Sequence, residues 1–124
     1  MTETNTLLFY VADPVVSGRF YAGLLGREPV EVSPTFVLVV LPSGLALGLW
    51  KATGVEPAPT AAGGGGELGF KVARAGDVDV THAAWTARGA TIALPPTDLD
   101  FGRSFVALDP DGHRLRVYAL ADAA

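Results

Sequence analysis

The sequence predicts an α+β fold made of two tandem βαβββ modules. A strand-like run, a helix-like run and three further strand-like runs follow one another in the first half of the chain, and this order returns in the second half. Each helix-like run is followed by a glycine, Gly26 or Gly89, and glycine is a common helix stop. Between the halves, residues 53–66 read TGVEPAPTAAGGGG, a composition that is typical of a flexible link.

The linker sets the boundaries of this organisation. We expect a single domain over residues 1–124, with module one at about 6–51, the linker at about 53–66 and module two at about 67–120. With 49% hydrophobic residues, a chain of this length can bury a core without disulfides or a structural metal.

Module one opens with a strand at residues 7–12 and a helix after Asp13. Aspartate is a favoured N-cap, and Pro14 suits the first helical position because no amide donor is needed there. The helix should end before Gly26. Three short strands follow, at residues 30–32, 36–41 and 45–50.

Module two repeats the pattern with a strand at residues 68–72 and a helix at 77–88. The helix is expected to begin at Asp77, 12 residues before Gly89, and Trp85 has the spacing that packs it on a sheet. The remaining strands are expected at residues 91–94, 103–108 and 113–119.

The last two strands should form a hairpin with one polar face. The turn sequence DPDG at residues 109–112 has Pro at the second position and Gly at the fourth, as a type I turn prefers. On the last strand, Leu115, Val117 and Ala119 alternate with Arg114, Arg116 and Tyr118. Alternation places two guanidinium groups and a phenol on one face, where a functional site should be sought.

Composition excludes several classes of function. The net charge is −4 and the nine Lys and Arg residues are scattered, which argues against a nucleic-acid partner. The absence of Cys removes disulfides, thiolate metal sites and cysteine nucleophiles. No apolar run reaches the length of a membrane span and the first residues lack a basic leader, so we expect a soluble cytoplasmic protein without a membrane partner.

The chain resembles the vicinal oxygen chelate superfamily, which includes glyoxalase I, extradiol dioxygenases and bleomycin-resistance proteins. The resemblance covers about residues 5–120 and rests on the paired modules, on FYAGLLG at 20–26 and on DPDGH at 109–113. Within the superfamily the resemblance is to the phenazine-antibiotic resistance proteins, through REPV at 27–30, Trp50, ELG at 67–69 and FGRSF at 101–105. It implies a curved mixed sheet around a cavity, a planar aromatic ligand, and a homodimer whose interface forms the cavity.

Catalytic members of that superfamily hold a divalent metal on four inward-facing side chains, normally His, Glu or Gln. The resemblance puts Thr6, Gly48 or a neighbour, Glu67 and Arg116 at these positions. Only Glu67 could bind a metal, and a guanidinium group would repel one. The two histidines lie at no ligand position of the family pattern. We therefore expect no metal and no other cofactor.

Four polar residues belong to the predicted ligand-binding site. If Glu67 and Arg116 occupy former ligand positions, they could form an ion pair, which a lowered Glu67 pKa would favour. The alternative is that one or both reach solvent. Arg103 and Ser104 could present donors to a carboxylate on an aromatic ligand, or Arg103 could lie in solvent at a strand edge.

Five aromatic residues complete the predicted site. Aromatic side chains stack on flat ligands with a large contact area, and the expected platform is Trp50, Phe36 and Phe101. Strand parity adds Tyr10, which shares a face with Thr6, and Tyr118, which shares a face with Arg116. The alternative for each ring is a place in the core.

Three functions stay open at this point. The first is metal-free binding and sequestration of a planar aromatic molecule, such as a phenazine-type antibiotic, in a dimer-interface cavity. The second is a metal-dependent enzyme of the glyoxalase or dioxygenase kind with displaced ligands, such as Glu67 with His113. The third is a degenerate module that mainly dimerises and regulates a partner. We favour the first, because the family's metal positions have lost their donors.

Overall fold

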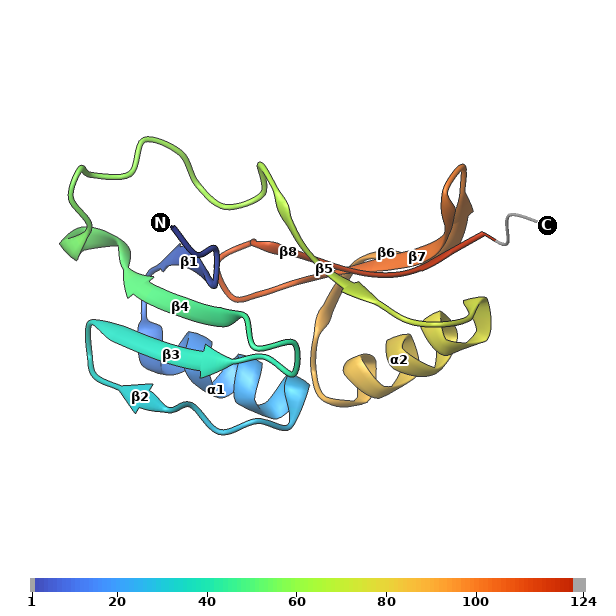
Figure 1. Cartoon of the computed structure of the whole chain (residues 1–124), viewed down its shortest axis with the longest axis horizontal. Helices are drawn as coiled ribbons and strands as arrows, with labels where there is room; N and C mark the ends of the chain where they lie inside the picture. The colour runs from blue at the N-terminus through green and yellow to red at the C-terminus, as the bar shows by residue number, and fades with distance from the viewer. Residues whose placement is uncertain (1, 122–124) are drawn as a thin grey trace. The chain divides into compact units, whose positions relative to one another are not determined.

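A computed structural model describes residues 2–121 of the chain. Its elements follow the order βαβββ twice, so the predicted α+β class and tandem modules are confirmed (Figure 1). The chain divides into two compact units, Met1–Gly63 and Gly64–Ala124. The eight strands within residues 2–121 form two four-stranded sheets, one in each unit. Neither main helix of this part of the chain has the length and apolar character that crossing a membrane requires.

The first unit contains a four-stranded mixed sheet and one α-helix. Its elements are β1 (Thr6–Val11), α1 (Pro14–Leu25), β2 (Glu31–Val32), β3 (Phe36–Val40), β4 (Ala46–Lys51) and the short 3-10 helix η1 (Ala52–Gly54). The sheet order is β1-β4-β3-β2. Strand β4 runs parallel to β1 and antiparallel to β3, so the first and last long strands of the module lie side by side.

The start of α1 has the capping expected from its sequence. The Asp13 Oδ1 atom accepts hydrogen bonds from the amides of Val15 at 3.0 Å and Val16 at 3.3 Å. Pro14 is the first helical residue, and Gly26 ends the helix with a left-handed φ of 65°. These local signals define both ends of the helix without reference to tertiary contacts.

Helix α1 covers one face of the first sheet (Figure 1). The residues beneath it are Val37, Val39, Leu47 and Leu49, all of them almost fully buried. A Cβ atom on Gly18 of α1 would lie only 2.9 Å from Cγ1 of Val37, so glycine lets the helix approach this closely. The opposite side of the sheet faces away from α1, and we call it the first open face.

The second unit repeats this architecture. Its elements are β5 (Glu67–Lys71), α2 (Ala75–Ala87), β6 (Thr91–Leu99), β7 (Gly102–Leu108) and β8 (Arg114–Leu120). The sheet order is β5-β8-β7-β6, with β5 parallel to β8 and the other neighbours antiparallel. As in the first unit, the first and last strands of the module are neighbours.

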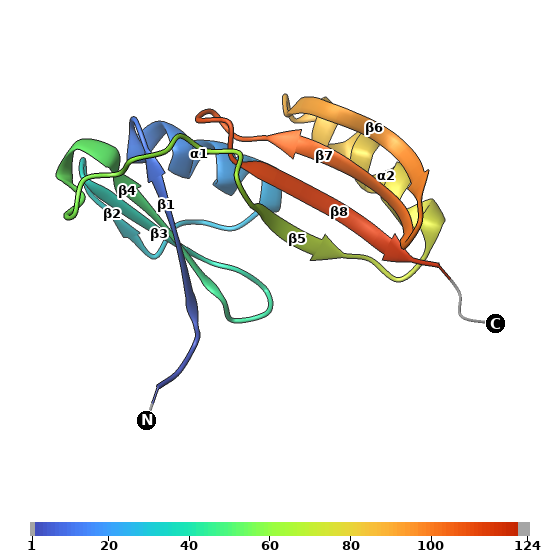
Figure 2. The ribbon, with the colours of Figure 1, turned by 90° about the horizontal axis from the view of Figure 1, so that it is seen from above.

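Trp85 anchors α2 on the second sheet, as its spacing predicts. Its ring meets those of Phe70 and Phe105 edge to face, with centroid distances of 5.3 and 5.5 Å. Trp85 and Phe105 are both buried. Figures 1 and 2 show α2 along this side of the sheet. The side of this sheet that faces away from α2 is called the second open face.

Two predicted boundaries in the second unit are wrong. Helix α2 begins at Ala75 and not at Asp77, because Arg74 is the N-cap and its amide donates to Asp77 Oδ2 at 3.1 Å. Strand β6 continues past residue 94 to Leu99, through two prolines. It can do so because β6 is an edge strand, and its pairing with β7 is irregular at this point.

The predicted turn between β7 and β8 is confirmed. The Gly112 amide donates to the Asp109 carbonyl oxygen at 3.1 Å, which closes the four-residue turn. The buried Asp109 side chain also accepts from the amides of Asp111 and His113, each at 2.9 Å. Asp109 therefore fixes the hairpin whose second strand carries the polar face.

Candidate functional site

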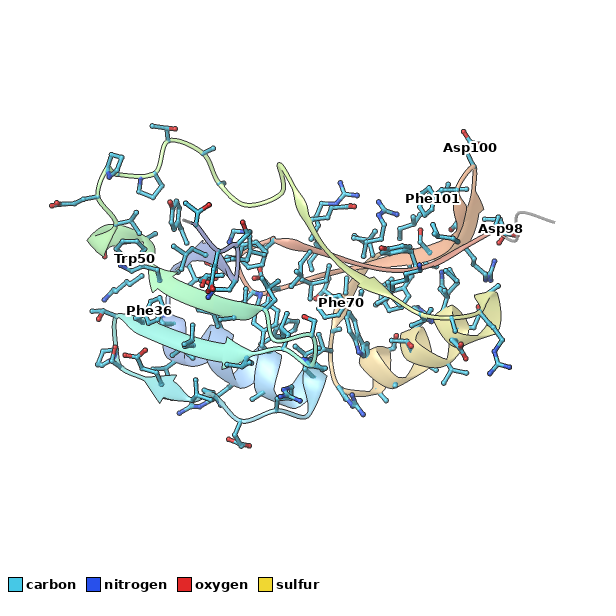
Figure 3. The ribbon with its side chains drawn as sticks, in the orientation of Figure 1. Phe36, Trp50, Phe70, Asp98, Asp100 and Phe101 are labelled. Carbon is cyan, nitrogen blue, oxygen red and sulfur yellow. The ribbon has the colours of Figure 1, made fainter. Side chains whose placement is uncertain are left out.

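Three aromatic side chains form one row across the first open face. Tyr10 of β1 pairs with Trp50 of β4, and Trp50 pairs with Phe36 of β3. Directly paired residues project on the same side of a sheet, and this is the side away from Val37 and Leu49. The Tyr10 and Trp50 rings meet edge to face at 6.3 Å. We call these three residues the aromatic row, and Figure 3 labels two of its members, Phe36 and Trp50.

The residues next to the aromatic row on this face are apolar, and two side chains lie over a glycine. Gly48 pairs with Leu8 of β1 and Leu38 of β3, two residues along each strand from the aromatic row. A Cβ atom on Gly48 would lie 2.6 Å from Cδ2 of Leu8 and 2.9 Å from Cζ of Phe36. The space in which a side chain at position 48 would stand is therefore filled by two apolar groups.

The second open face carries a cluster of ion pairs. The Glu67 carboxylate of β5 accepts from Arg116 Nε at 2.7 Å and from Arg116 Nη2 at 2.9 Å. Arg114 Nη2 contacts the same carboxylate at 3.0 Å, and Arg116 Nη1 donates to the buried Ser104 Oγ at 2.9 Å. We call these four residues the Glu67 cluster. The predicted ion pair between Glu67 and Arg116 is confirmed, and Ser104 supports it from β7.

The electrostatics of the cluster keep both partners charged. The pKa of Glu67 lies below its ordinary value, mainly because of the hydrogen bonds from Arg116, with further lowering by the charges of Arg116 and Arg114. Partial burial opposes this shift. The same hydrogen bonds raise the pKa of Arg116. Glu67 thus remains an anion at neutral pH and is already occupied by two cations.

Two aromatic rings extend the second open face beyond this cluster. Tyr118 lies two residues after Arg116 on β8, and its ring meets that of Phe101 edge to face at 6.4 Å. Phe101 stands at the turn between β6 and β7, where Figure 3 labels it beside Asp100, and is 41% exposed. The Tyr118 ring also lies close to Gly69, where a Cβ atom would be 3.3 Å from its Cε1.

Arg103 lies on the other side of the second sheet from Ser104. Its Nε and Nη2 atoms donate to Asp79 of α2 at 3.0 and 2.9 Å, and its Nη1 donates to Asp98 of β6 at 3.0 Å. The guanidinium group lowers the pKa of Asp79. Arg103 therefore ties α2 to the sheet, and the structure does not bring it together with Ser104 on the second open face.

The side chains at the four positions that the resemblance assigns to a metal do not fit a divalent cation. Glu67 is the one carboxylate among them, and both of its oxygens are bound by arginines. Thr6 offers a single hydroxyl, Gly48 offers no donor, and Arg116 is a cation. Within residues 2–121, no three or more His, Cys, Asp or Glu side chains gather into a group that could hold a metal.

Sequence reasoning missed the part that Arg114 plays in the Glu67 cluster. Strand parity already places Arg114 on the same face as Arg116. Its contact with Glu67 depends on the register of β5 against β8, in which Glu67 pairs with Arg114, and no local signal in the sequence reveals that register.

Comparisons with known proteins agree on a family. The model of the Glyoxalase/Bleomycin resistance protein/Dioxygenase superfamily matches residues 4–117. The phenazine antibiotic resistance protein EhpR of Enterobacter agglomerans is 33% identical over 120 residues, which cover 94% of this chain and 91% of that protein. The solution structure of protein ATC0852 from Agrobacterium tumefaciens is 49% identical, with a TM-score of 0.88, over 98% of this chain and all of that one. A glyoxalase-related enzyme from Fulvimarina pelagi shares the fold, with a TM-score of 0.82 at 22% identity over 96% of this chain and 88% of that one.

Proposed function

The chain belongs to the Glyoxalase/Bleomycin resistance protein/Dioxygenase superfamily, and from this membership we propose that it binds and sequesters a planar aromatic small molecule, such as a phenazine-type antibiotic. The name of its relative EhpR supports this class of ligand. The proposed site is the aromatic row of Tyr10, Trp50 and Phe36 in the first unit. In the second unit, Phe101 and Tyr118 are proposed as aromatic contacts of that unit's own open face. The binding is proposed to need no metal ion.

The observation that carries this proposal is the aromatic row. Three aromatic side chains stand side by side on the sheet face opposite the α-helix of the same unit. Tyr10 is 42% exposed and its neighbour Leu8 is 44% exposed, although large apolar groups of a folded domain are normally buried. Flat ligands bind such surfaces because aromatic rings offer a large rigid contact area at little cost in rotamer freedom.

The state of Glu67 supports binding without metal. A carboxylate that is to ligate a divalent cation must turn a free oxygen toward it. Both oxygens of Glu67 are instead bound by Arg116, and Arg114 contacts one of them. A metal ion at this position would have to displace two cations and would then lie beside them. The enzymatic alternative with His113 finds no support in these contacts.

We further propose that a second copy of the chain encloses the ligand. Leu8 and Tyr10 are exposed, so part of the first open face is not covered within its own unit. Ligand sites in proteins usually bury most of the ligand surface, which a single flat face cannot do. Two-fold symmetric dimers are the commonest oligomers of soluble proteins, and a second copy would supply the missing cover.

Tryptophan fluorescence tests the ligand and its site. The chain has two tryptophans, Trp50 in the aromatic row and Trp85 beneath α2. We expect phenazine-1-carboxylic acid and unsubstituted phenazine to quench Trp50 in the Trp85→Phe variant. In separate binding titrations that do not use Trp50 fluorescence, Trp50→Ala should lower the affinity for these compounds by about tenfold or more, since an aromatic contact is lost. The control Val16→Ala removes an exposed apolar group on α1 and should bind like the parent. Unchanged affinity of Trp50→Ala would contradict the assignment of the aromatic row.

Two further measurements address the metal and the dimer. Protein purified without chelator should contain no near-stoichiometric metal, and a bound metal that is lost in Glu67→Gln would overturn metal-free binding. Sedimentation at the concentration used for binding should report a dimer. A monomer that binds the ligands with full affinity would refute the enclosed dimer cavity and leave the aromatic row in place.

A further inference from the structure

On the second open face, cationic side chains outnumber anionic ones. Its strands contribute the cations Lys71, Arg114 and Arg116, and Glu67 is the only anion that the described strands place on this side of the sheet. The face therefore has a surplus of two positive charges, whereas the whole chain has a net charge of −4. A local surplus of cations on an acidic protein favours an anionic ligand there.

The two arginines of the Glu67 cluster are engaged to different degrees. Arg116 donates hydrogen bonds from Nε and Nη2 to Glu67 and from Nη1 to Ser104, so all three of its guanidinium nitrogens are engaged. Arg114 contacts Glu67 through Nη2, while its Nε is buried and has no hydrogen-bond partner in the structure. A buried donor without an acceptor is unfavourable, so this conformation leaves Arg114 unsatisfied.

Arg114 also has access to solvent. Its side chain is 40% exposed, against 18% for Arg116. Because Arg116 already neutralises Glu67 through a bidentate contact, the charge of Arg114 is the one left over in the cluster. The guanidinium group of Arg114 can turn toward an acceptor on the open side without breaking the pair between Glu67 and Arg116.

We infer that the second open face binds an aromatic acid and that Arg114 binds its carboxylate; the aromatic class of this ligand rests on the proposed function. A guanidinium group binds a carboxylate through two parallel hydrogen bonds, which fixes the orientation of a flat molecule. The ring of Tyr118 lies on the same face as Arg114, four residues or about 13 Å along β8, and the ring of Phe101 contacts that of Tyr118. The face thus offers a cation at one end and aromatic surface at the other.

A pair of ligands with one ring system tests this inference. Phenazine-1-carboxylic acid carries the carboxylate and phenazine does not, so we expect the parent protein to bind the acid about tenfold or more tightly at pH 7.5. Arg114→Gln should remove most of that preference and change the affinity for phenazine by less than about twofold. Arg114→Lys keeps the charge without the paired donors and should keep part of the preference. Arg19→Gln removes the same charge from α1 and should leave it intact.

The outcomes separate this inference from the proposed function. Equal affinity of the parent protein for both compounds would overturn the role of a carboxylate and leave aromatic binding in place. Loss of both ligands in Arg114→Gln, with unchanged stability, would also overturn it, because Arg114 would then support the aromatic contact and not the acid group. Binding of neither compound by the parent protein would overturn both proposals.

Discussion

Replacing Glu67 by Gln should destabilise the second unit in a way that depends on pH. The carboxylate accepts two hydrogen bonds from Arg116 and one contact from Arg114. A glutamine retains one acceptor oxygen, and its amide group would face a guanidinium donor. Hydrogen bonds to charged groups contribute about 1.5–3 kcal/mol when buried, and exposed ion pairs contribute about 0–1 kcal/mol. Because Glu67 is 29% exposed, we expect a loss of about 1–2 kcal/mol at pH 7.

The pH dependence has a definite sign. The pKa of Glu67 is lowered in the folded protein from its ordinary value of 4.5, so its contribution is present above that value and is lost as pH falls through the lowered pKa. Glutamine does not titrate. The difference in the free energy of unfolding between the parent and Glu67→Gln should therefore be largest near neutral pH and should shrink once the pH falls below 4.5.

Urea unfolding in a Trp50→Phe background measures this difference where it arises. In that background Trp85, which is buried in the second unit, is the only tryptophan and reports on the unit that contains Glu67. Glu31→Gln, at an exposed position of β2 in the first unit, is the matched control and should leave the transition unchanged. The reasoning would be refuted by a difference below about 0.3 kcal/mol at pH 7, or by one that is as large at pH 3.

Three further substitutions test the fold that carries the site. Gly102→Ala should destabilise the second unit by about 3 kcal/mol or more in urea unfolding, because Gly102 has a φ of 146° and a Cβ atom would lie 2.0 Å from the Ala119 carbonyl oxygen. Trp85→Ala should cost about 3–5 kcal/mol by the same measurement, and a loss below about 1 kcal/mol would contradict its place as the anchor of α2. Asp109→Ala should cost about 1–3 kcal/mol, since two turn amides lose their acceptor, and Asp109→Asn should recover part of the loss because it keeps an oxygen.

Local signals in the sequence predicted the elements of the fold, and tertiary pairing decided what they missed. Asp13, Pro14 and Gly26 act within their own helix, so α1 could be placed from the sequence. The start of α2 was misplaced because a basic residue, Arg74, serves as its N-cap, which residue preferences do not anticipate. The extension of β6 was missed because the tolerance of a strand for proline depends on its place at the sheet edge.

Strand parity and the positions of the family pattern predicted part of the site. Parity placed Tyr10 on the same face as Thr6, and the family pattern brought Glu67 to Arg116. Arg103 and Ser104 are consecutive in a strand, so parity also implies that they face opposite ways, as the structure has them. The partner of Arg103 on α2, Asp79, lies 24 residues away in the chain, and only the folded structure brings the two together. The ligand contacts of all these residues stay predictions.

The crowding around Gly48 restricts which side chains position 48 can accept. A substitution that introduced a metal-binding side chain there would place its Cβ atom against Leu8 and Phe36, and both side chains would have to move. Phe36 belongs to the aromatic row, so the first step toward a metal site would disturb the surface proposed for the aromatic ligand. Position 67 would meanwhile remain occupied by its arginines. A metal-binding side chain introduced at position 48 is therefore expected to disturb the aromatic row without gaining a free carboxylate at position 67.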